Sequence, residues 1–191
     1  MQEPGSIIAW LVEAIPSKAD IEKFLEALGN SFRKPGRLYL AGGAALVHIG
    51  LRPGSTMDID VAIEASDEDE MVTAIRKSVE KMQINVKFAS PGDSIPLPAQ
   101  WMAQARYVGR YGSIDVFYFD FYSLALSKIS RGNDRDLIDV QLLLQQKLIT
   151  LEELDAAYNE VLPGMGKRPY INLNPQRFAE RYALVRQKLQ E

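Results

Sequence analysis

The sequence contains no cysteine, and this absence excludes a disulfide framework and any metal site built on thiolates. It also has no apolar run near the length of a membrane span, and Met1 to Pro4 lack the basic start of a signal peptide. The single histidine, His48, lies among apolar residues of a helix-prone segment. We expect it to be a packed or half-exposed imidazole rather than a catalytic one, and we expect a cytoplasmic protein with no membrane contact.

Charge is distributed unevenly along the chain. The net charge is −3, but residues 1–162 hold 16 Lys or Arg against 23 Asp or Glu, whereas residues 163–191 hold 6 against 2. The basic residues of this tail are Lys167, Arg168, Arg177, Arg181, Arg186 and Lys188. They form either a local anion-binding surface or the solvated face of a helix.

The hydropathy pattern predicts an α/β (α+β) chain, in which strands and helices are interspersed and the C-terminal portion is helical. We expect strands at 37–41, 57–63, 85–89, 105–110 and 113–119, and helices at 6–14, 17–28, 44–49, 66–82, 122–130, 134–146, 151–161 and 175–189. Ser17 with Asp20, and Thr150 with Glu153, have the spacing of capping boxes. The expected division is a core at 1–120, including the N-terminal helices, and a helical portion at 121–191 packed on it.

The pattern most informative about function is Asp58-Ile59-Asp60. Side chains two apart on a strand point the same way, so these two carboxylates can jointly bind a hard cation such as Mg²⁺ or Mn²⁺. A lone Asp-x-Asp is weak, because glycosyltransferases use the same pattern for the metal of a nucleotide sugar and acidic turns match it by chance.

A glycine pair precedes the carboxylates. Gly42 and Gly43 separate an expected strand from a helix-prone segment, a position where phosphate can approach backbone N–H groups. Arg52 and Ser55 lie in the turn before the acidic pair. They are candidates for nucleotide contact, although a turn alone is enough to explain Ser55.

This order of features resembles the nucleotidyltransferase superfamily, whose hallmark is a strand, Gly-Gly or Gly-Ser, a short helix, a spacer, and Asp-x-Asp or Asp-x-Glu on a strand. Within it, the chain looks most like the branch of the AbiEii-type toxins of bacterial type IV toxin–antitoxin systems and related uncharacterised bacterial proteins. That branch shows Gly-Gly-x-Ala-Leu, a Leu-Arg step, Ser or Thr, and Asp-Ile-Asp, all of which occur between Gly42 and Asp60. The spacer is at the long end of the family's range. The resemblance implies a nucleotidyltransferase-like fold, a mixed β-sheet flanked by helices.

A second block extends the resemblance to about residues 37–145. The family carries a lysine, and often an arginine, on one helix and Arg-Asp-x-x-Asp at the start of the next, as at Lys128, Arg131 and Arg135-Asp136. The resemblance implies that Lys128 pairs with phosphate and that Arg131 assists it. It leaves three roles for Asp136: orienting Lys128, touching the acceptor, or holding the helices together. For Asp139 we expect a structural salt bridge.

Many nucleotidyltransferases bring a third acid from a later strand to the metal pair. Asp115, on an expected strand with Phe117 and Phe119 on the same face, is our candidate. The alternative is an edge residue that faces solvent.

The resemblance implies a metal-dependent nucleotidyltransferase that moves a nucleoside monophosphate from an NTP to a hydroxyl of tRNA, a protein or a small molecule, and a toxin of this branch implies a cognate antitoxin. Two alternatives remain: a catalytically silent member that binds nucleotide or a partner, and a transferase that uses a nucleotide sugar. We expect the loop at 90–100, rich in proline, and the helical tail to read the base and the acceptor. The pattern does not distinguish oligomeric states.

Overall fold

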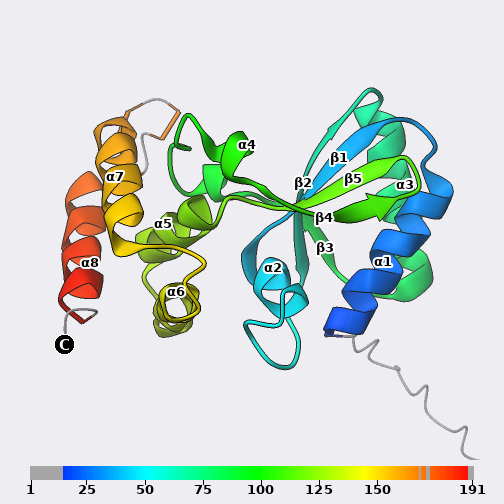
Figure 1. Cartoon of the computed structure of the whole chain (residues 1–191). Helices are drawn as coiled ribbons and strands as arrows, with labels where there is room; N and C mark the ends of the chain where they lie inside the picture. Colours follow the sequence, from blue (N-terminus) through cyan, green and yellow to red (C-terminus); the bar gives the residue numbers. More distant parts are fainter. Residues whose placement is uncertain (1–14, 168, 171–172, 189–191) are drawn as a thin grey trace, which may run out of the picture.

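The computed structural model describes residues 15–167, 169–170 and 173–188, and its centre is a five-stranded sheet in the order β3-β2-β1-β5-β4 (Figure 1). The strands are β1 (Gly36–Leu40), β2 (Ile59–Ala65), β3 (Val86–Phe88), β4 (Arg106–Tyr111) and β5 (Ile114–Tyr118). β1 runs parallel to β5 and antiparallel to β2, while β3 runs parallel to β2 and β4 antiparallel to β5. The predicted mixed sheet is therefore confirmed.

The helices are α1 (Lys18–Ser31), α2 (Gly42–His48), α3 (Glu68–Met82), α4 (Trp101–Gln104), α5 (Phe121–Arg131), α6 (Asp134–Gln145), α7 (Leu151–Val161) and α8 (Pro175–Lys188), with short 3₁₀ turns η1 (Pro91–Asp93) and η2 (Leu162–Gly164). Figure 1 shows α1, α2 and α3 around the sheet, and α5 to α8 gathered beside it. The expected α/β fold with a helical C-terminal part is confirmed. The division at residue 120 stays a prediction, because η1, which precedes it, packs on α5.

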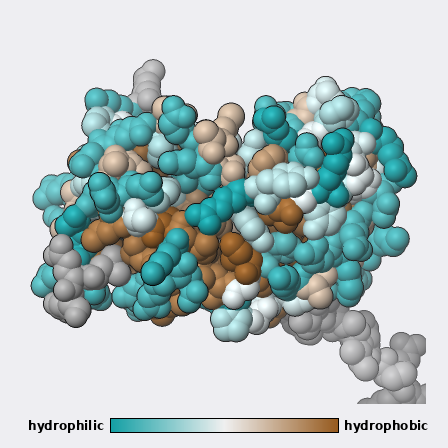
Figure 2. All heavy atoms as spheres, in the orientation of Figure 1, coloured by the Kyte–Doolittle hydropathy of each residue, from teal (hydrophilic) through white to brown (hydrophobic). Residues whose placement is uncertain are grey.

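The core follows the two periodicities of the sequence. Leu38 and Leu40 of β1, with Val61 and Val116 beside them on β2 and β5, are fully or almost fully buried. Alternate residues of a strand share one face, so these side chains form the layer against which helices pack. Apolar side chains also reach the surface over the C-terminal helices (Figure 2), where Ile138 and Leu184 are exposed.

The sequence predicts capping boxes at the starts of two helices, and the structure confirms one in full and the other in part. Ser17 and Asp20 form the predicted reciprocal capping box. Thr150 caps α7 by accepting from the Glu153 N–H, but the reciprocal bond is missing because the Thr150 N–H donates to the Tyr122 hydroxyl. That second capping box is therefore only half correct.

Two further expectations concern a helix at 6–14 and the burial of His48. The expected helix at 6–14 lies outside the described residues. His48 is buried, as expected, and its ring nitrogens lie 2.8 Å from the Tyr118 hydroxyl and 2.8 Å from Glu22 Oε1. No helix among the described residues is long and apolar enough to cross a membrane.

Candidate active site

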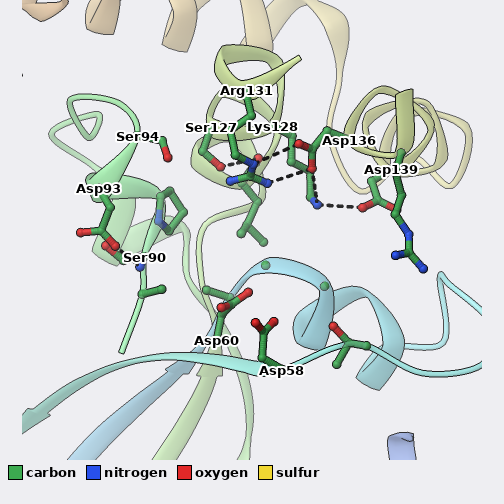
Figure 3. Close-up of a pocket in the computed structure, with 18 of the residues that line it drawn as sticks. Asp58, Asp60, Ser90, Asp93, Ser94, Ser127, Lys128, Arg131, Asp136 and Asp139 are labelled. Carbon is green, nitrogen blue, oxygen red and sulfur yellow. Dashed lines mark hydrogen bonds and ion pairs between the residues drawn. The ribbon is translucent and has the colours of Figure 1, made fainter. Parts of the chain in front are cut away.

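A cleft of about 310 Å³ lies between one end of the sheet and the C-terminal helices (Figure 3). The turn from β1 into α2, the start of β2 and the chain after β3 form one side, and α5 and α6 form the other. Its polar lining includes Gly42, Gly43, Arg52, Thr56, Asp58, Asp60, Ser90, Asp93, Ser127, Lys128, Arg131, Asn133, Asp136 and Asp139. The size is at the lower end of the range for small-molecule sites.

The two carboxylates of the Asp-x-Asp pattern lie on the same side of the cleft. Asp58 precedes β2 and Asp60 is its second residue, and both point toward α5 and α6 (Figure 3). Burial and then the charge of Asp58 raise the pKa of Asp60 to about 6. The fold therefore holds two mutually repelling carboxylates close together, an arrangement that a divalent cation stabilises.

Gly42 makes room for this pair. Its φ of +55° favours glycine, and a Cβ built at Gly42 would overlap the Asp60 carboxylate. At Gly43 a Cβ would lie 2.6 Å from Thr56 Oγ1 and 3.1 Å from Arg52 Nη2. The sequence analysis assigned both glycines to phosphate approach, whereas the structure shows that each also admits a neighbouring polar side chain.

The opposite wall is a buried ionic network between α5 and α6. Lys128, only 3% exposed, places its Nζ 2.7 Å from Asp139 Oδ2 and 3.3 Å from Asp136 Oδ1. Arg131 donates two hydrogen bonds to Asp136, of 3.0 and 2.8 Å. Burial alone would raise the pKa of Asp136, but the Arg131 hydrogen bonds and the nearby Lys128 charge outweigh it and lower that pKa.

Arg52 connects this network to the sheet side of the cleft. Its Nη1 lies 3.2 Å from Asp139 Oδ2, and Nη2 donates to the Ser55 carbonyl oxygen at 3.5 Å. The buried atoms Arg52 Nε and Asp139 Oδ1 find no hydrogen-bond partner among the described residues. These atoms are one donor and one acceptor of the buried network that remain unsatisfied.

The structure brings most of the predicted residues together. Gly42, Gly43, Arg52, Asp58, Asp60, Lys128, Arg131 and Asp136 all line the cleft. Lys128 differs from the expectation in one respect, because its ammonium lies between Asp136 and Asp139. Arg131, whose side chain is 45% exposed, is the more accessible cation.

Asp115 and Ser55 do not line the cleft. Asp115 pairs with Arg37 in the β1–β5 ladder, four residues before Ala41, and its carboxylate is 3.9 Å from Arg110 Nη1 on a separate depression. At about 3.3 Å per residue, this position is about 13 Å along the strand from the end that carries the pair. The structure therefore does not bring Asp115 to the metal pair as predicted. Ser55 instead forms an isolated bridge with Ser17.

Two polar residues near the carboxylates, Thr56 and Lys87, had escaped the sequence analysis. Thr56 lines the cleft, as do Ser90, Asp93 and Ser94 of the loop that the sequence analysis had assigned to the base and the acceptor. Lys87 lies beside Asp60 on β3 and forms an ion pair with Asp58. Only the strand order reveals Lys87, because nothing local in the sequence shows that β3 is the neighbour of β2.

Some basic side chains of the tail make contacts within the protein. Arg181 donates to the Ser130 carbonyl oxygen at the end of α5, and Arg186 forms a two-bond ion pair with Asp155 of α7. Arg177, Lys167 and Lys188 are exposed, and Arg168 lies outside the described residues. Two of the six basic residues therefore brace α8 against its neighbours.

The donor set fits a divalent cation that shares its coordination with a substrate. Mg²⁺ is commonly bound through one or two carboxylates plus substrate phosphates. Asp58 and Asp60 supply the two carboxylates, and no group of three acidic, histidine or cysteine residues that could hold a metal exists within the described ranges. Phosphate oxygens and water would complete the coordination.

We expect Gly42→Ala to weaken Mn²⁺ binding at least about tenfold, because the added methyl group displaces the Asp60 carboxylate. Isothermal titration with Mn²⁺ measures the effect. Gly54→Ala is the matched control: Gly54 also has a positive φ, of +88°, but a Cβ there meets nothing within 4 Å. Equal losses in both variants would show that backbone strain, not the steric contact with Asp60, is responsible.

The raised pKa of Asp60 predicts a pH-dependent stability in metal-free buffer. The folded protein holds the Asp60 proton more tightly than the unfolded chain, so this contribution is present below about pH 4 and is lost as the pH rises through about 6. Asp60→Asn lacks this loss. With EDTA present, the melting temperature of the variant minus that of wild type should therefore increase from about pH 4 to about pH 7. A flat difference, equal to that of Asp115→Asn outside the cleft, would contradict the prediction.

Comparison with known proteins agrees with this geometry. Residues 19–183 match the model of the family described as "Nucleotidyltransferase of unknown function (DUF6036)". Comparisons with curated proteins and with solved structures gave no match. The matched range contains every residue that lines the cleft. The chain therefore belongs to this family of nucleotidyltransferases of unknown function.

Proposed function

We propose that the chain is an active, metal-dependent nucleotidyltransferase that moves a nucleoside monophosphate from an NTP to a hydroxyl acceptor. The observation that carries the proposal is the opposition of charge across one cleft. Asp58 and Asp60 stand on the sheet side, and Arg131 and Lys128 stand on the helical side (Figure 3). A triphosphate with a bound divalent cation has the complementary distribution of charge.

Each wall has a separate task in this reaction. Asp58 and Asp60 would hold Mg²⁺ or Mn²⁺, which would neutralise phosphate charge. Arg131, with a planar guanidinium that is partly exposed, binds phosphate oxygens. Asp136 fixes the direction of that guanidinium through two hydrogen bonds. The acceptor hydroxyl forms a bond to the α-phosphorus and gives up its proton to water, while the bond from that phosphorus to the bridging oxygen breaks and pyrophosphate leaves.

Lys128 acts mainly through its neighbours. Its ammonium, buried between Asp136 and Asp139, adds positive charge to the wall that faces the phosphates and keeps α5 and α6 in register. Two of its three N–H donors are used by these carboxylates, which leaves one for a phosphate oxygen. In this proposal Asp136 orients Lys128, one of the three roles that the sequence left open, and it orients Arg131 as well.

The finer proposal is that the chain acts as a toxin of the AbiEii-type branch, with tRNA or a protein as acceptor and a cognate antitoxin as partner. It rests on two segments that are similar to that branch: residues 42–60, and the block that contains Lys128 and Arg135-Asp136. The exposed basic residues Arg177 and Lys188 of α8 are the candidate contacts of that tail for an RNA acceptor.

Transfer is tested by incubating the protein with each α-³²P-labelled NTP, Mg²⁺ or Mn²⁺, and total cell RNA plus protein. We expect label on a macromolecule, and a loss on the order of a hundredfold or more in Asp58→Ala/Asp60→Ala, because the cation is no longer held. Asp115→Ala, a carboxylate of the same sheet outside the cleft, is the matched control and should retain activity. Metal-dependent NTP binding without transfer to any acceptor, small molecules included, would favour the silent nucleotide-binding member instead.

The toxin role predicts growth arrest when the wild-type chain is expressed in bacteria. Asp58→Ala/Asp60→Ala should grow normally at equal protein level, since arrest requires transfer. Co-expression of the neighbouring gene should restore growth if that gene encodes an antitoxin. Normal growth with a chain that is active in the labelling assay would reject the toxin role and leave the transferase intact.

A further inference from the structure

We propose that Lys87 takes the place of a third metal-ligating carboxylate, so that the cleft accepts one divalent cation rather than two. The proposal rests on the proposed transferase function, since it concerns how the same carboxylate pair is used. Lys87 is a positioning residue in this view, because it touches Asp58 and not the reacting atoms.

The sheet register places Lys87 next to the carboxylate pair. β3 runs parallel to β2, and Lys87 is the direct partner of Asp60 in that ladder. Paired residues on neighbouring strands project from the same face, so the two side chains lie side by side. β3 is the edge strand of the sheet, and therefore Lys87 is the last side chain of this row before solvent. A carboxylate at this position would have completed a three-acid cluster.

The contact of Lys87 reinforces this placement. Its ammonium forms an ion pair with Asp58 Oδ2, although the Lys87 side chain is 56% exposed and Asp58 only 16%. The Lys87 ammonium therefore contacts one carboxylate oxygen of Asp58 from the solvent side. A second cation approaching Asp58 from that side meets a like charge.

The other carboxylates of the cleft each have a partner of their own. Asp93, which is exposed, accepts a hydrogen bond of 2.7 Å at Oδ2 from the Ser90 N–H. Asp136 and Asp139 are paired with Lys128, and Asp115 lies on a separate depression with Arg110. Within the described ranges, no third acidic ligand therefore stands beside Asp58 and Asp60.

The charges of the protein groups, counted without the substrate, favour the same stoichiometry. Asp58 and Asp60 contribute two negative charges and Lys87 one positive charge, giving −1 before any metal binds. One divalent cation brings this local set to +1, whereas two bring it to +3. In a two-metal site, the second metal supplies positive charge beside the carboxylates. Here the Lys87 ammonium supplies part of that positive charge.

The test counts bound Mn²⁺ per chain by equilibrium dialysis and electron paramagnetic resonance, with a non-hydrolysable α,β-methylene NTP analogue present. Wild type should bind one Mn²⁺. Lys87→Glu should bind two, because it creates the missing third carboxylate, and Lys87→Gln should bind one with affinity raised about tenfold through loss of the competing charge. Lys81→Glu, a charge reversal on the exposed surface of α3, should bind one with wild-type affinity.

Two Mn²⁺ on the wild-type chain would overturn the proposal while leaving the transferase function in place. One Mn²⁺ on both wild type and Lys87→Glu, with circular dichroism showing that the variant is folded, would overturn the role of Lys87. One Mn²⁺ with bound analogue on wild type and two on Lys87→Glu would support the proposal even if labelling found no transfer. In that case the proposed activity alone would fail.

Discussion

The buried ion pair between Lys128 and Asp139 is the interaction on which the cleft depends. Both side chains are almost fully removed from water, so each charge is stable only while its partners remain in place. Asp136 and Arg52 complete the arrangement, and Arg52 extends it to the turn before β2. The network thereby fixes the spacing between the helical wall and the carboxylates on the sheet.

The charges on the two sides of the cleft are not fully neutralised by their own neighbours, and the sign of the excess differs between the sides. In the ionic network, three cations (Arg52, Lys128, Arg131) meet two carboxylates (Asp136, Asp139), leaving one positive charge in excess. On the sheet side, burial and the charge of Asp58 disfavour the ionised form of Asp60 and raise its pKa. The proposed metal-bound polyphosphate would stabilise both sides at once, because the cation would meet the acids and the phosphates would meet the arginine.

Local patterns predicted the parts of the site that lie within one element or one turn. Asp58, Asp60 and Gly42 follow from strand periodicity and a strand-to-helix turn. Lys128 and Arg131 were chosen through the resemblance to the superfamily, and helical spacing only places them on one face. Strand register and strand order are not local properties. The register explains why Asp115 was assigned to the wrong end of the sheet, and the strand order explains why Lys87 was overlooked. Once β3 is known to pair with β2, Lys87 is the obvious neighbour of Asp60.

The pairing of Lys128 could not be read from spacing either, because Asp136 and Asp139 belong to the next helix and reach it only through the bend at Gly132 and Asn133. Gly132 ends α5 with φ +67°, and Asn133 caps α6. This tight reversal makes α5 and α6 neighbours, so the lysine of one helix meets the carboxylates of the next. Lys128 thus pairs with carboxylates of the next helix, and Arg131 beside it is the more exposed cation of the cleft.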